Sequence, residues 1–306
     1  MGILIGISIC VILYIAVIVI FARSYGFNFH FNDLENKTIV ITGSSAGIGK
    51  SVLTELEKTK AKIIVCGKQP INNSRVTFVE LDLSDINSIK KCSEEIHQLT
   101  NKIDLLINNA GCLYTSFDKK TTQGYDMTIG TNYIGHAAFT IQLLDLINTK
   151  DEENKSRILI TSSLNAGDWH HKDIPFVFEE NCKNPPTDPY YASKFGNSLF
   201  ATCLAQRYRN IDVVHIHPGL VRSTLWRNFP PVMDYLYKLI LPLFGRSCEE
   251  GSQTILYCCF APQLESGEYY ADCVPQEINP LLRDNEVLET NWNTLMKELA
   301  NYGIKP

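Results

Sequence analysis

Tyr190 and Lys194 stand four positions apart in the segment Tyr190-Tyr191-Ala192-Ser193-Lys194. On a helix this spacing places a phenol and an ammonium on one face, one turn apart. A phenol ordinarily titrates near ~10, and a neighbouring cation favours the phenolate and lowers that pKa. The pair therefore predicts a Tyr190 that gives and takes a proton, which interconversion of an alcohol and a carbonyl requires. The simpler alternative is a solvated helix face on which the two side chains carry no chemistry.

A glycine-rich turn lies far upstream of this pair. The β-branched run from Lys37 to Thr42 predicts a buried strand, and it leads into Gly43-Ser44-Ser45-Ala46-Gly47-Ile48-Gly49. A helical pattern follows from Lys50 to Lys60. In this order the glycines let a pyrophosphate approach the backbone, and the helix start offers free N–H groups to it. An ordinary glycine turn is the alternative, but the flanking strand and helix are those that a dinucleotide site needs.

The second predicted strand, from Ala61 to Lys68, bears on the choice of cofactor. A carboxylate at its end would bond the ribose 2′-OH of NAD, whereas a cation would accept the 2′-phosphate of NADP. Gly67 occupies the carboxylate position and Lys68 follows it. The sequence therefore favours NADP(H), with NAD(H) as the second choice because lysine is a flexible point charge. An exposed lysine with no ligand is the alternative.

With these motifs the chain resembles the short-chain dehydrogenase/reductases, and within them the membrane-anchored retinol-dehydrogenase-like group. The resemblance covers about residues 36 to 300 and rests on motifs in the expected order: Thr42 to Gly49; Asn108-Asn109-Ala110-Gly111 after the apolar strand Ile103 to Ile107; Asn132 within Thr131 to His136; Ser163 after the strand Arg157 to Ser162; Pro218-Gly219 with Thr224; and the ending Gly267 to Cys273. It implies an α/β fold, with a single Rossmann-like doubly wound parallel sheet and helices on both faces.

The same resemblance implies four catalytic residues: Asn132, Ser163, Tyr190 and Lys194. Tyr190 would exchange the proton, and Lys194 would lower its pKa and hold the nicotinamide ribose. Ser163 would hydrogen-bond the substrate oxygen, and Asn132 would fix a helix bend and a water in the proton relay. Tyr191 is the competitor, since it lies three positions from Lys194. The family pattern requires four, so Tyr191 is predicted to be a packing residue.

The residues that the resemblance assigns to the cofactor come from the glycine turn and from strand ends. They are Gly43, Ser44, Ser45, Gly47, Ile48, Gly49, Lys68, Asp82, Leu83, Asn109, Ala110, Gly111, Tyr190, Lys194, Pro218, Gly219 and Thr224. Asp82, which follows a predicted strand from Val76 to Leu81, would contact the adenine; otherwise it is a turn residue before a helix. The histidines show no metal-ligand pattern, so we expect no metal and assign them structural or solvated positions.

The N-terminus carries an uncharged run from Ile3 to Ala22, long enough as a helix to cross the hydrocarbon core of a bilayer. A cleaved signal peptide requires a basic N-terminal region and a cleavage site of small residues, and neither is clear in this sequence. We therefore expect a retained single-pass anchor at 1–24, followed by a catalytic domain at 36–302. Arg23, the first charged residue, favours a cytosolic catalytic domain by the positive-inside rule, on the endoplasmic reticulum or a related organelle.

Two segments are expected to shape the substrate site. Ala166 to Pro189 is long and carries aromatic residues, and 225–245 is rich in large apolar side chains. The second segment is either ordinary core or a lid that admits apolar substrates from the membrane. The anchor favours the lid, because a membrane-held enzyme meets lipophilic substrates where they partition.

Composition limits the remaining possibilities. The 306 residues are long enough for one large domain, and a net charge of −5 speaks against nucleic acid as a partner. The ten cysteines form no pair with metal-ligand spacing, which suits a reduced compartment. The oligomeric state stays open, a homodimer included.

These observations together predict an NADP(H)-dependent oxidoreductase that interconverts a lipophilic alcohol and its aldehyde or ketone. Retinoid is the leading substrate class, and a sterol, a fatty aldehyde or another lipid carbonyl is the close alternative. A catalytically silent, anchored interaction protein is the hypothesis from another class. The intact set of Asn132, Ser163, Tyr190 and Lys194 argues against it.

Overall fold

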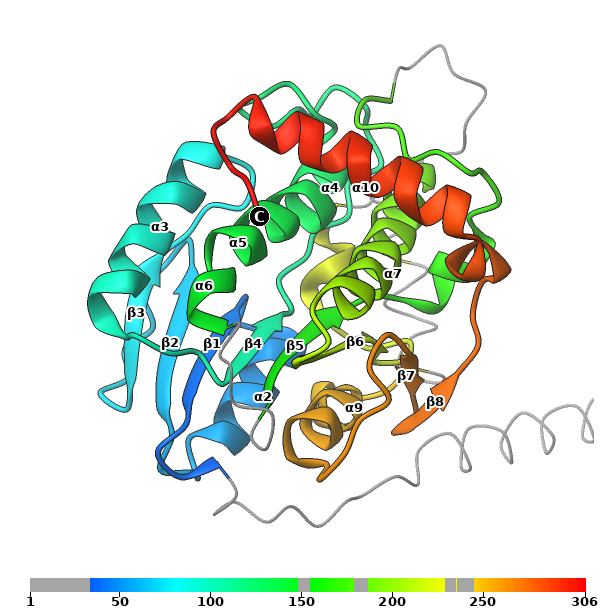
Figure 1. The fold of residues 1–306 in the computed structure, drawn as a ribbon. Coiled ribbons are helices and arrows are strands. Elements are labelled where there is room, and N and C mark those ends of the chain that lie inside the picture. Colours follow the sequence, from blue (N-terminus) through cyan, green and yellow to red (C-terminus); the bar gives the residue numbers. More distant parts are fainter. Residues whose placement is uncertain (1–33, 148–154, 179–186, 229–234, 236–244) are drawn as a thin grey trace, which may run out of the picture.

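The computed structural model describes residues 34–147, 155–178, 187–228, 235 and 245–306. Within these ranges eight strands form one sheet in the order β3-β2-β1-β4-β5-β6-β7-β8 (Figure 1). The strands are β1 (Thr38–Thr42), β2 (Lys62–Gly67), β3 (Val76–Glu80), β4 (Leu105–Asn108), β5 (Ser156–Thr161), β6 (Ile211–His217), β7 (Tyr269–Ala271) and β8 (Val274–Gln276). All neighbouring strands pair in parallel except β7 and β8, which are antiparallel.

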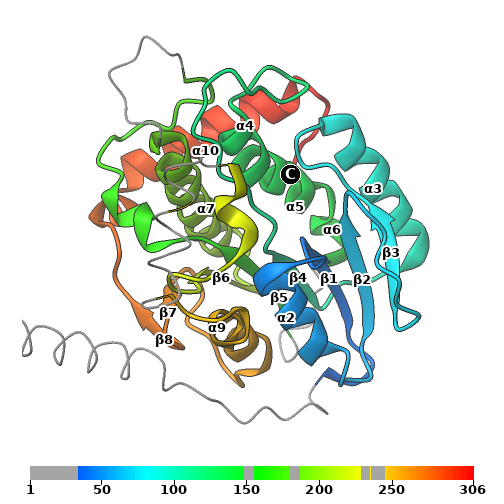
Figure 2. The same cartoon turned by 180° about the vertical axis from the view of Figure 1, so that it is seen from behind.

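Helices cover both faces of the sheet. One face packs against α2 (Gly47–Leu56) and α9 (Cys248–Phe260), which lie together in Figure 2. The opposite face packs against α3 (Ile86–Leu99), α4 (Met127–Ile129), α5 (Gly135–Gln142), α6 (Leu144–Ile147) and α7 (Asp188–Arg207), with α10 (Asn285–Ala300) outside α7. In β1, Ile39 and Ile41 face the first layer and Val40 faces the second. The predicted doubly wound parallel sheet is therefore confirmed.

The chain reverses its direction of winding between β1 and β4. From β1 it proceeds outward to β2 and β3, and then returns to place β4 on the other side of β1. Crevices at such a switch point, beyond the carboxyl ends of the strands, are where open α/β sheets bind ligands. Thr42 ends β1 and Asn108 ends β4, so both candidate motifs begin at this crevice.

The predicted helix after the glycine turn is shifted in the structure. The expected limits were 50 and 60, but α2 begins at Gly47 and ends at Leu56. The start moves because the glycine motif itself supplies the first turn. The end moves because the Thr59 hydroxyl and the Thr59 N–H both bond the carbonyl of Leu56 and close the helix. The predicted strands agree with the observed ones to within two residues.

The predicted anchor at 1–24 and most of the predicted lid at 225–245 lie outside the described residues. The first part of that segment is visible as a short 3₁₀ helix, Thr224–Asn228. Among the helices of the described ranges, none combines the length and the apolar character needed to cross a membrane.

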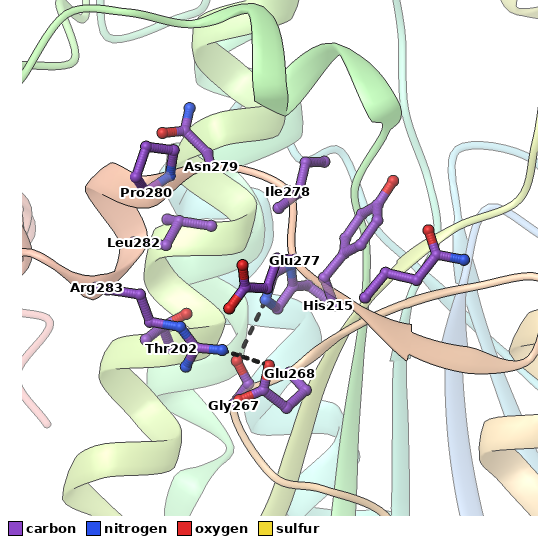
Figure 3. A pocket seen from close by; sticks show the side chains of 12 residues that line it. Thr202, His215, Gly267, Glu268, Glu277, Ile278, Asn279, Pro280, Leu282 and Arg283 are labelled. Atoms are coloured by element: carbon purple, nitrogen blue, oxygen red, sulfur yellow. Dashed lines mark hydrogen bonds and ion pairs between the residues drawn. The ribbon is translucent and has the colours of Figure 1, made fainter.

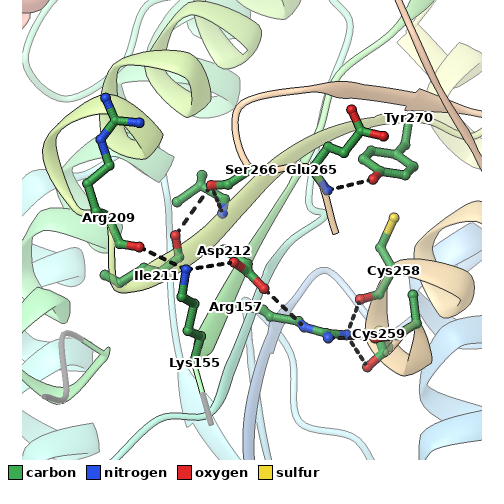
Figure 4. Close-up of polar contacts among 12 residues, drawn as sticks. Lys155, Arg157, Arg209, Ile211, Asp212, Cys258, Cys259, Glu265, Ser266 and Tyr270 are labelled. Atoms are coloured by element: carbon green, nitrogen blue, oxygen red, sulfur yellow. Dashed lines mark hydrogen bonds and ion pairs between the residues drawn. The ribbon is translucent and has the colours of Figure 1, made fainter. Parts of the chain in front are cut away.

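At the amino ends of the strands, Arg157 attaches α9 to the sheet (Figure 4). Its guanidinium donates to the carbonyls of Cys258 and Cys259 at 3.0 and 3.1 Å and to that of Ala261 at 2.5 Å. Asp212 on the neighbouring strand lies 4.0 Å from the same guanidinium. The arginine thereby satisfies carbonyls that a helix C-terminus leaves unpaired. This contact lies at the end of the sheet opposite to the carboxyl edge, where the candidate site lies.

Candidate active site

The glycine turn packs tightly against the segment after β4. Gly43 has a φ of +71°, which glycine adopts without strain, and a methyl group there would lie 2.6 Å from Cα of Ala110. A methyl group on Gly49 would collide with the carbonyl of Gly43 and with the side chain of Asn109. No other residue fits these positions, so the glycines bring the start of α2 and the Asn109-Ala110 backbone together.

The N-terminus of α2 is left open. Ala46 at the N-cap provides no side-chain hydrogen bond, and the first turn carries no acidic residue. By contrast, Asp85 caps α3 and Ser247 caps α9 with its hydroxyl. Ser44 beside the turn is 2% exposed, and its hydroxyl has no hydrogen-bond partner among the described residues. Free N–H groups, a positive dipole end and an unpaired hydroxyl suit a dinucleotide pyrophosphate, so the turn fits the cofactor that the motif predicts.

Thr42 fixes the Asn-Asn-Ala-Gly segment from the end of β1. Its hydroxyl oxygen accepts hydrogen bonds from the backbone N–H groups of Asn109 and Ala110, both at 3.0 Å. The Asn109 amide donates back to the carbonyls of Thr42 and Gly43 at 3.1 and 3.2 Å. Sequence reasoning placed Thr42 at the start of the motif but gave it no role in the site.

The end of β2 is open and carries an ion pair. A methyl group on Gly67 would meet no atom within 4 Å. Lys68, which is largely exposed, lies 2.8 Å from the carboxylate of Asp82. Partial burial of Asp82 opposes ionisation, but the hydrogen bonds from Lys68 and Ser84 together lower the pKa of this carboxyl below its ordinary value. A charged pair with free space beside it therefore stands where the cofactor ribose is expected.

Asn132 lies in a π-helical turn, Gly130–Ile134, that joins α4 to α5. Its side-chain oxygen accepts from the backbone N–H of Cys112 at 2.8 Å, and its amide donates to the Cys112 carbonyl at 2.8 Å. The amide also donates to the hydroxyl of Ser193 at 3.1 Å. A π-helical turn stands where the helix bend is expected, and the side chain ties the segment after β4 to α7.

Tyr190 and Lys194 lie one turn apart on α7, and the Lys194 ammonium is 5.6 Å from the centre of the Tyr190 ring. The ammonium donates to the carbonyl of Thr161, at the end of β5, at 3.0 Å. Ser163 follows the same strand and lies near enough to the Tyr190 phenol to act on its pKa, while its hydroxyl donates to the side-chain oxygen of Asn165 at 3.0 Å. Ser193, which lies between Tyr190 and Lys194 in the sequence, donates to the carbonyl of Tyr190 at 2.7 Å. Tyr191 is half-buried against the core, as predicted for a packing residue.

The electrostatics of this group differ from the expectation. Burial raises the pKa of Tyr190 to about 12, although Ser163 acts in the opposite direction. Burial also lowers the pKa of Lys194 to about 8. The Tyr190 pKa thus stands above its ordinary value, not below it as expected. The reason is that the phenolate would be taken out of water, and this cost exceeds the opposing effect of Ser163.

The segment after β6 returns to the glycine turn. Gly219 has a φ of +88°, and a methyl group there would lie 2.7 Å from Cδ of Arg246, which is itself paired with Asp272 at 2.6 Å. Two later residues of the same segment contact other parts of the site. Ser223 lies 3.6 Å from a methyl position on Gly47, and Asn228 donates to the carbonyl of Leu113 at 3.2 Å.

The histidines of β6 occupy structural positions. His215 is 1% exposed and lines a cavity of about 270 Å³ between α7 and the 276–283 segment, where it contacts the carbonyl of Gly267 (Figure 3). His217 accepts a hydrogen bond from the backbone N–H of Leu164 at 3.2 Å. Across the described part of the chain no three His, Cys, Asp or Glu side chains gather in a way that suits a metal ion.

The structure thus brings most of the predicted residues to one edge of the sheet. A methyl position on Gly111 lies 3.5 Å from the Asn132 side-chain oxygen and 3.8 Å from the Lys194 ammonium, so the two candidate groups share one corner. Lys68 and Asp82 stand apart at the ends of β2 and β3, beyond the glycine turn. Sequence reasoning missed three residues that connect the site: Thr42, Ser193 and His136. The only signal in the sequence was their place within or beside the motifs.

Comparison with known proteins agrees with this geometry. Residues 37–175 match the family model described as short chain dehydrogenase. The chain is 33% identical over 280 residues to retinol dehydrogenase 12 and 30% identical over 294 residues to retinol dehydrogenase 14, both of Homo sapiens, and each comparison covers 85% of both chains.

Solved structures agree on the fold. One of them, the 3-ketoacyl-(acyl-carrier-protein) reductase of Brucella melitensis, superposes with a TM-score of 0.61. The sequence identity is 20%, and the match covers 77% of this chain and 96% of the other. At this level of identity the likeness speaks for the fold alone.

Proposed function

Because this chain belongs to the short-chain dehydrogenase/reductase family, in its retinol-dehydrogenase-like branch, we propose that it is an NADP(H)-dependent oxidoreductase of lipophilic alcohols and their aldehydes or ketones. One observation carries the proposal. Ser163, Tyr190 and Lys194 meet at the end of β5, two strands from β1, which leads into the open glycine turn of α2. This arrangement supports the proposal of a proton-transfer group beside a dinucleotide site.

The proposed chemistry assigns each side chain a task at a named atom. The nicotinamide cofactor supplies or accepts the hydride when it is bound. In the reductive direction the Tyr190 hydroxyl gives its proton to the substrate carbonyl oxygen, and the Ser163 hydroxyl donates a hydrogen bond to the same oxygen. With a pKa of about 12 the phenol is protonated at neutral pH, so the site starts in the form that reduction needs. The Lys194 ammonium, held by the Thr161 carbonyl, stands beside the ring to stabilise the phenolate that forms.

Preference for NADP(H) over NAD(H) rests on the end of β2. Gly67 offers open space instead of a carboxylate, and the exposed Lys68 ammonium offers a charge to a 2′-phosphate. The Lys68 ammonium already pairs with Asp82 at 2.8 Å, so a 2′-phosphate would share the ammonium with this carboxylate. We expect a preference for NADPH that is measurable but smaller than one based on a bidentate arginine.

A lipophilic substrate is supported by exposed apolar side chains in the segments that follow β5 and β6. Leu164 follows Ser163 directly and is 63% exposed, and Leu220 follows Gly219 and is 46% exposed. Both stand just beyond the carboxyl ends of neighbouring strands, where a substrate would enter. Exposed leucines at such an entrance suit an apolar ligand. The names of the retinol dehydrogenase relatives make retinoid the leading class, with a sterol or a fatty aldehyde as the alternative.

The proposal also includes a membrane location, which rests on the segments 1–24 and 225–245. An anchor at 1–24 would hold the enzyme at the bilayer in which such substrates dissolve, and the apolar segment 225–245 would serve as the lid over the entrance. The catalytic domain would then face the cytosol, on the endoplasmic reticulum or a related organelle.

The substrate class is tested with membranes that carry the full chain. All-trans-retinal, a steroid ketone and a long-chain fatty aldehyde are each incubated with NADPH or NADH, and membranes with Tyr190→Phe serve as the control. We expect reduction of retinal with NADPH that the control lacks. Turnover of another carbonyl alone would replace the retinoid assignment. Binding of NADPH without turnover of any carbonyl would favour a silent interaction protein instead.

A further inference from the structure

His136 connects the two halves of the site. It lies on α5, one turn after Asn132, and it is 1% exposed. Its Nδ1 is 3.0 Å from the backbone carbonyl of Asn132, and its Nε2 is 3.0 Å from the hydroxyl of Thr42. The His136 ring therefore contacts both Thr42, which holds the Asn109-Ala110 backbone, and Asn132, which is hydrogen-bonded to Cys112 and Ser193.

The partners determine which nitrogen carries the hydrogen. A backbone carbonyl only accepts, so Nδ1 of His136 must be the donor to Asn132. The ring is neutral, because burial lowers the pKa of His136 to about 4 and Lys194 acts in the same direction, against the bond to the Asn132 carbonyl. With the hydrogen on Nδ1, Nε2 has only a lone pair to offer. The Thr42 hydroxyl must then donate to Nε2.

This assignment completes the hydrogen bonding of Thr42. A hydroxyl has one hydrogen and two lone pairs. The hydrogen goes to His136 at 3.0 Å, since the other acceptor in reach, the carbonyl of Ile107, is 3.5 Å away. Both lone pairs are then directed to the N–H groups of Asn109 and Ala110. Buried networks in which every member is satisfied fix one arrangement of their atoms.

We infer that His136 is a positioning residue, which holds the cofactor-side segment Asn109–Gly111 and the Asn132 turn in register through a single tautomer with the hydrogen on Nδ1. Its two nitrogens act on different halves of the site. Nε2 orients Thr42 and thereby the segment at the cofactor, whereas Nδ1 holds the carbonyl of the turn from which Asn132 reaches α7. The functional part of this inference rests on the proposed reductase activity, but the tautomer does not.

Two conservative variants separate the roles of the two ring nitrogens of His136. In His136→Asn the side-chain amide reaches the Nδ1 position and donates to Asn132, but nothing accepts from Thr42. In His136→Gln the longer side chain reaches the Nε2 position and accepts from Thr42, but the donor to Asn132 is lost. We expect His136→Asn to weaken NADPH binding about tenfold with kcat within twofold of wild type. We expect His136→Gln to lower kcat about tenfold with NADPH binding within twofold.

The measurements use the full chain in detergent, with NADPH binding followed by fluorescence and kcat measured on all-trans-retinal. A purely structural histidine would lose thermal stability and both parameters together in the two variants, and that outcome would overturn the inference. So would wild-type values in both.

Nitrogen NMR of histidine-labelled protein gives a readout that needs no substrate. His136 should show a protonated Nδ1 and an unprotonated Nε2 between pH 6 and 8, whereas the opposite tautomer sinks the assignment. If retinal is not reduced, the proposed substrate fails, while the tautomer and the NADPH affinities still decide the inference.

Discussion

Tyr190 and Tyr191 provide a matched pair at the residue scale. Ser163 acts on the pKa of Tyr190, whereas Tyr191 packs against the core. Tyr190→Phe removes one oxygen and keeps the ring, so turnover should fall about 10²–10⁴-fold, the usual loss for a general acid, with NADPH still bound. Tyr191→Phe should keep most of the activity. Turnover of both variants on one accepted carbonyl checks the assignment, and a collapse in Tyr191→Phe alone would reverse it.

Gly67 allows the cofactor preference to be changed with little disturbance of the fold. Its φ is not in the left-handed region, and a side chain there would enter open space. Gly67→Asp places a carboxylate where it repels a 2′-phosphate and bonds a ribose 2′-OH. We expect KM for NADPH to rise about tenfold or more and KM for NADH to fall, measured by initial rates with each cofactor.

The control for this change is Gly67→Ala, which adds no charge and should leave both constants nearly unaltered. Lys68→Ala should raise KM for NADPH alone, by a factor that corresponds to about 1–3 kcal/mol for a lost charge-assisted contact. A wild-type enzyme that prefers NADH would show that the interpretation of this strand end is wrong.

At the scale of elements, the contact between α7 and the π-helical turn depends on Gly196. A methyl group at this position would lie 2.8 Å from Cγ of the buried Tyr133 ring. Gly196→Ala gains up to ~1 kcal/mol of helix propensity, but the ring stem cannot move away. We therefore expect a net loss of about 1–3 kcal/mol in the free energy of unfolding, typical of overpacking.

The same substitution should affect the site, because Tyr133 adjoins Asn132 and Gly196 lies two residues from Lys194. We expect kcat to fall together with stability in Gly196→Ala. Chemical denaturation and turnover are compared with those of Gly67→Ala, whose added methyl group meets no atom within 4 Å. Unchanged stability in Gly196→Ala would contradict the close approach of the two elements.

At the scale of the whole molecule, buried histidines make stability depend on pH. Burial lowers the pKa of His215 to about 3 and that of His217 to about 4, from an ordinary value of 6.5. The unfolded chain binds these protons first as the pH falls, so the stabilisation is fully present above pH 6.5 and is lost progressively as the pH falls to about 4 for His217 and about 3 for His215.

His215→Phe isolates one of these groups, since it keeps a ring against Tyr269 and removes the titration. Between pH 6 and pH 4, the unfolding free energy of wild type should decline relative to the variant by up to ~1.4 kcal/mol per pH unit. His170→Gln, a change at an exposed position, should follow the wild-type pH dependence. Parallel curves for wild type and His215→Phe would exclude the contribution of His215.

The anchor is the other prediction for the whole molecule. If 1–24 spans a bilayer, washing membranes with alkaline carbonate should leave the full chain in the pellet. Deletion of 1–24 should give a more soluble protein with an unchanged circular dichroism spectrum. Release of the full chain by carbonate, or a mature N-terminus beyond Ala22, would contradict the anchor.

The sequence by itself determined the fold class, because its signals are local. The β-branched run before Gly43, the glycine turn and the spacing of Tyr190 and Lys194 depend on neighbours within a few residues, and the structure contains each of them. The motif order was also sufficient to indicate the family.

Only the tertiary structure decided the electrostatics and the connections of the site. The raised pKa of Tyr190 results from burial beneath elements distant in sequence, which no pair of neighbouring residues reveals. His136 meets Thr42 across 94 positions, and Arg246 lies against Gly219 only because their segments pair beside β6. Desolvation and long-range hydrogen bonds are properties of the packed chain, so the sequence names the chemical groups, and packing determines their pKa values and their partners.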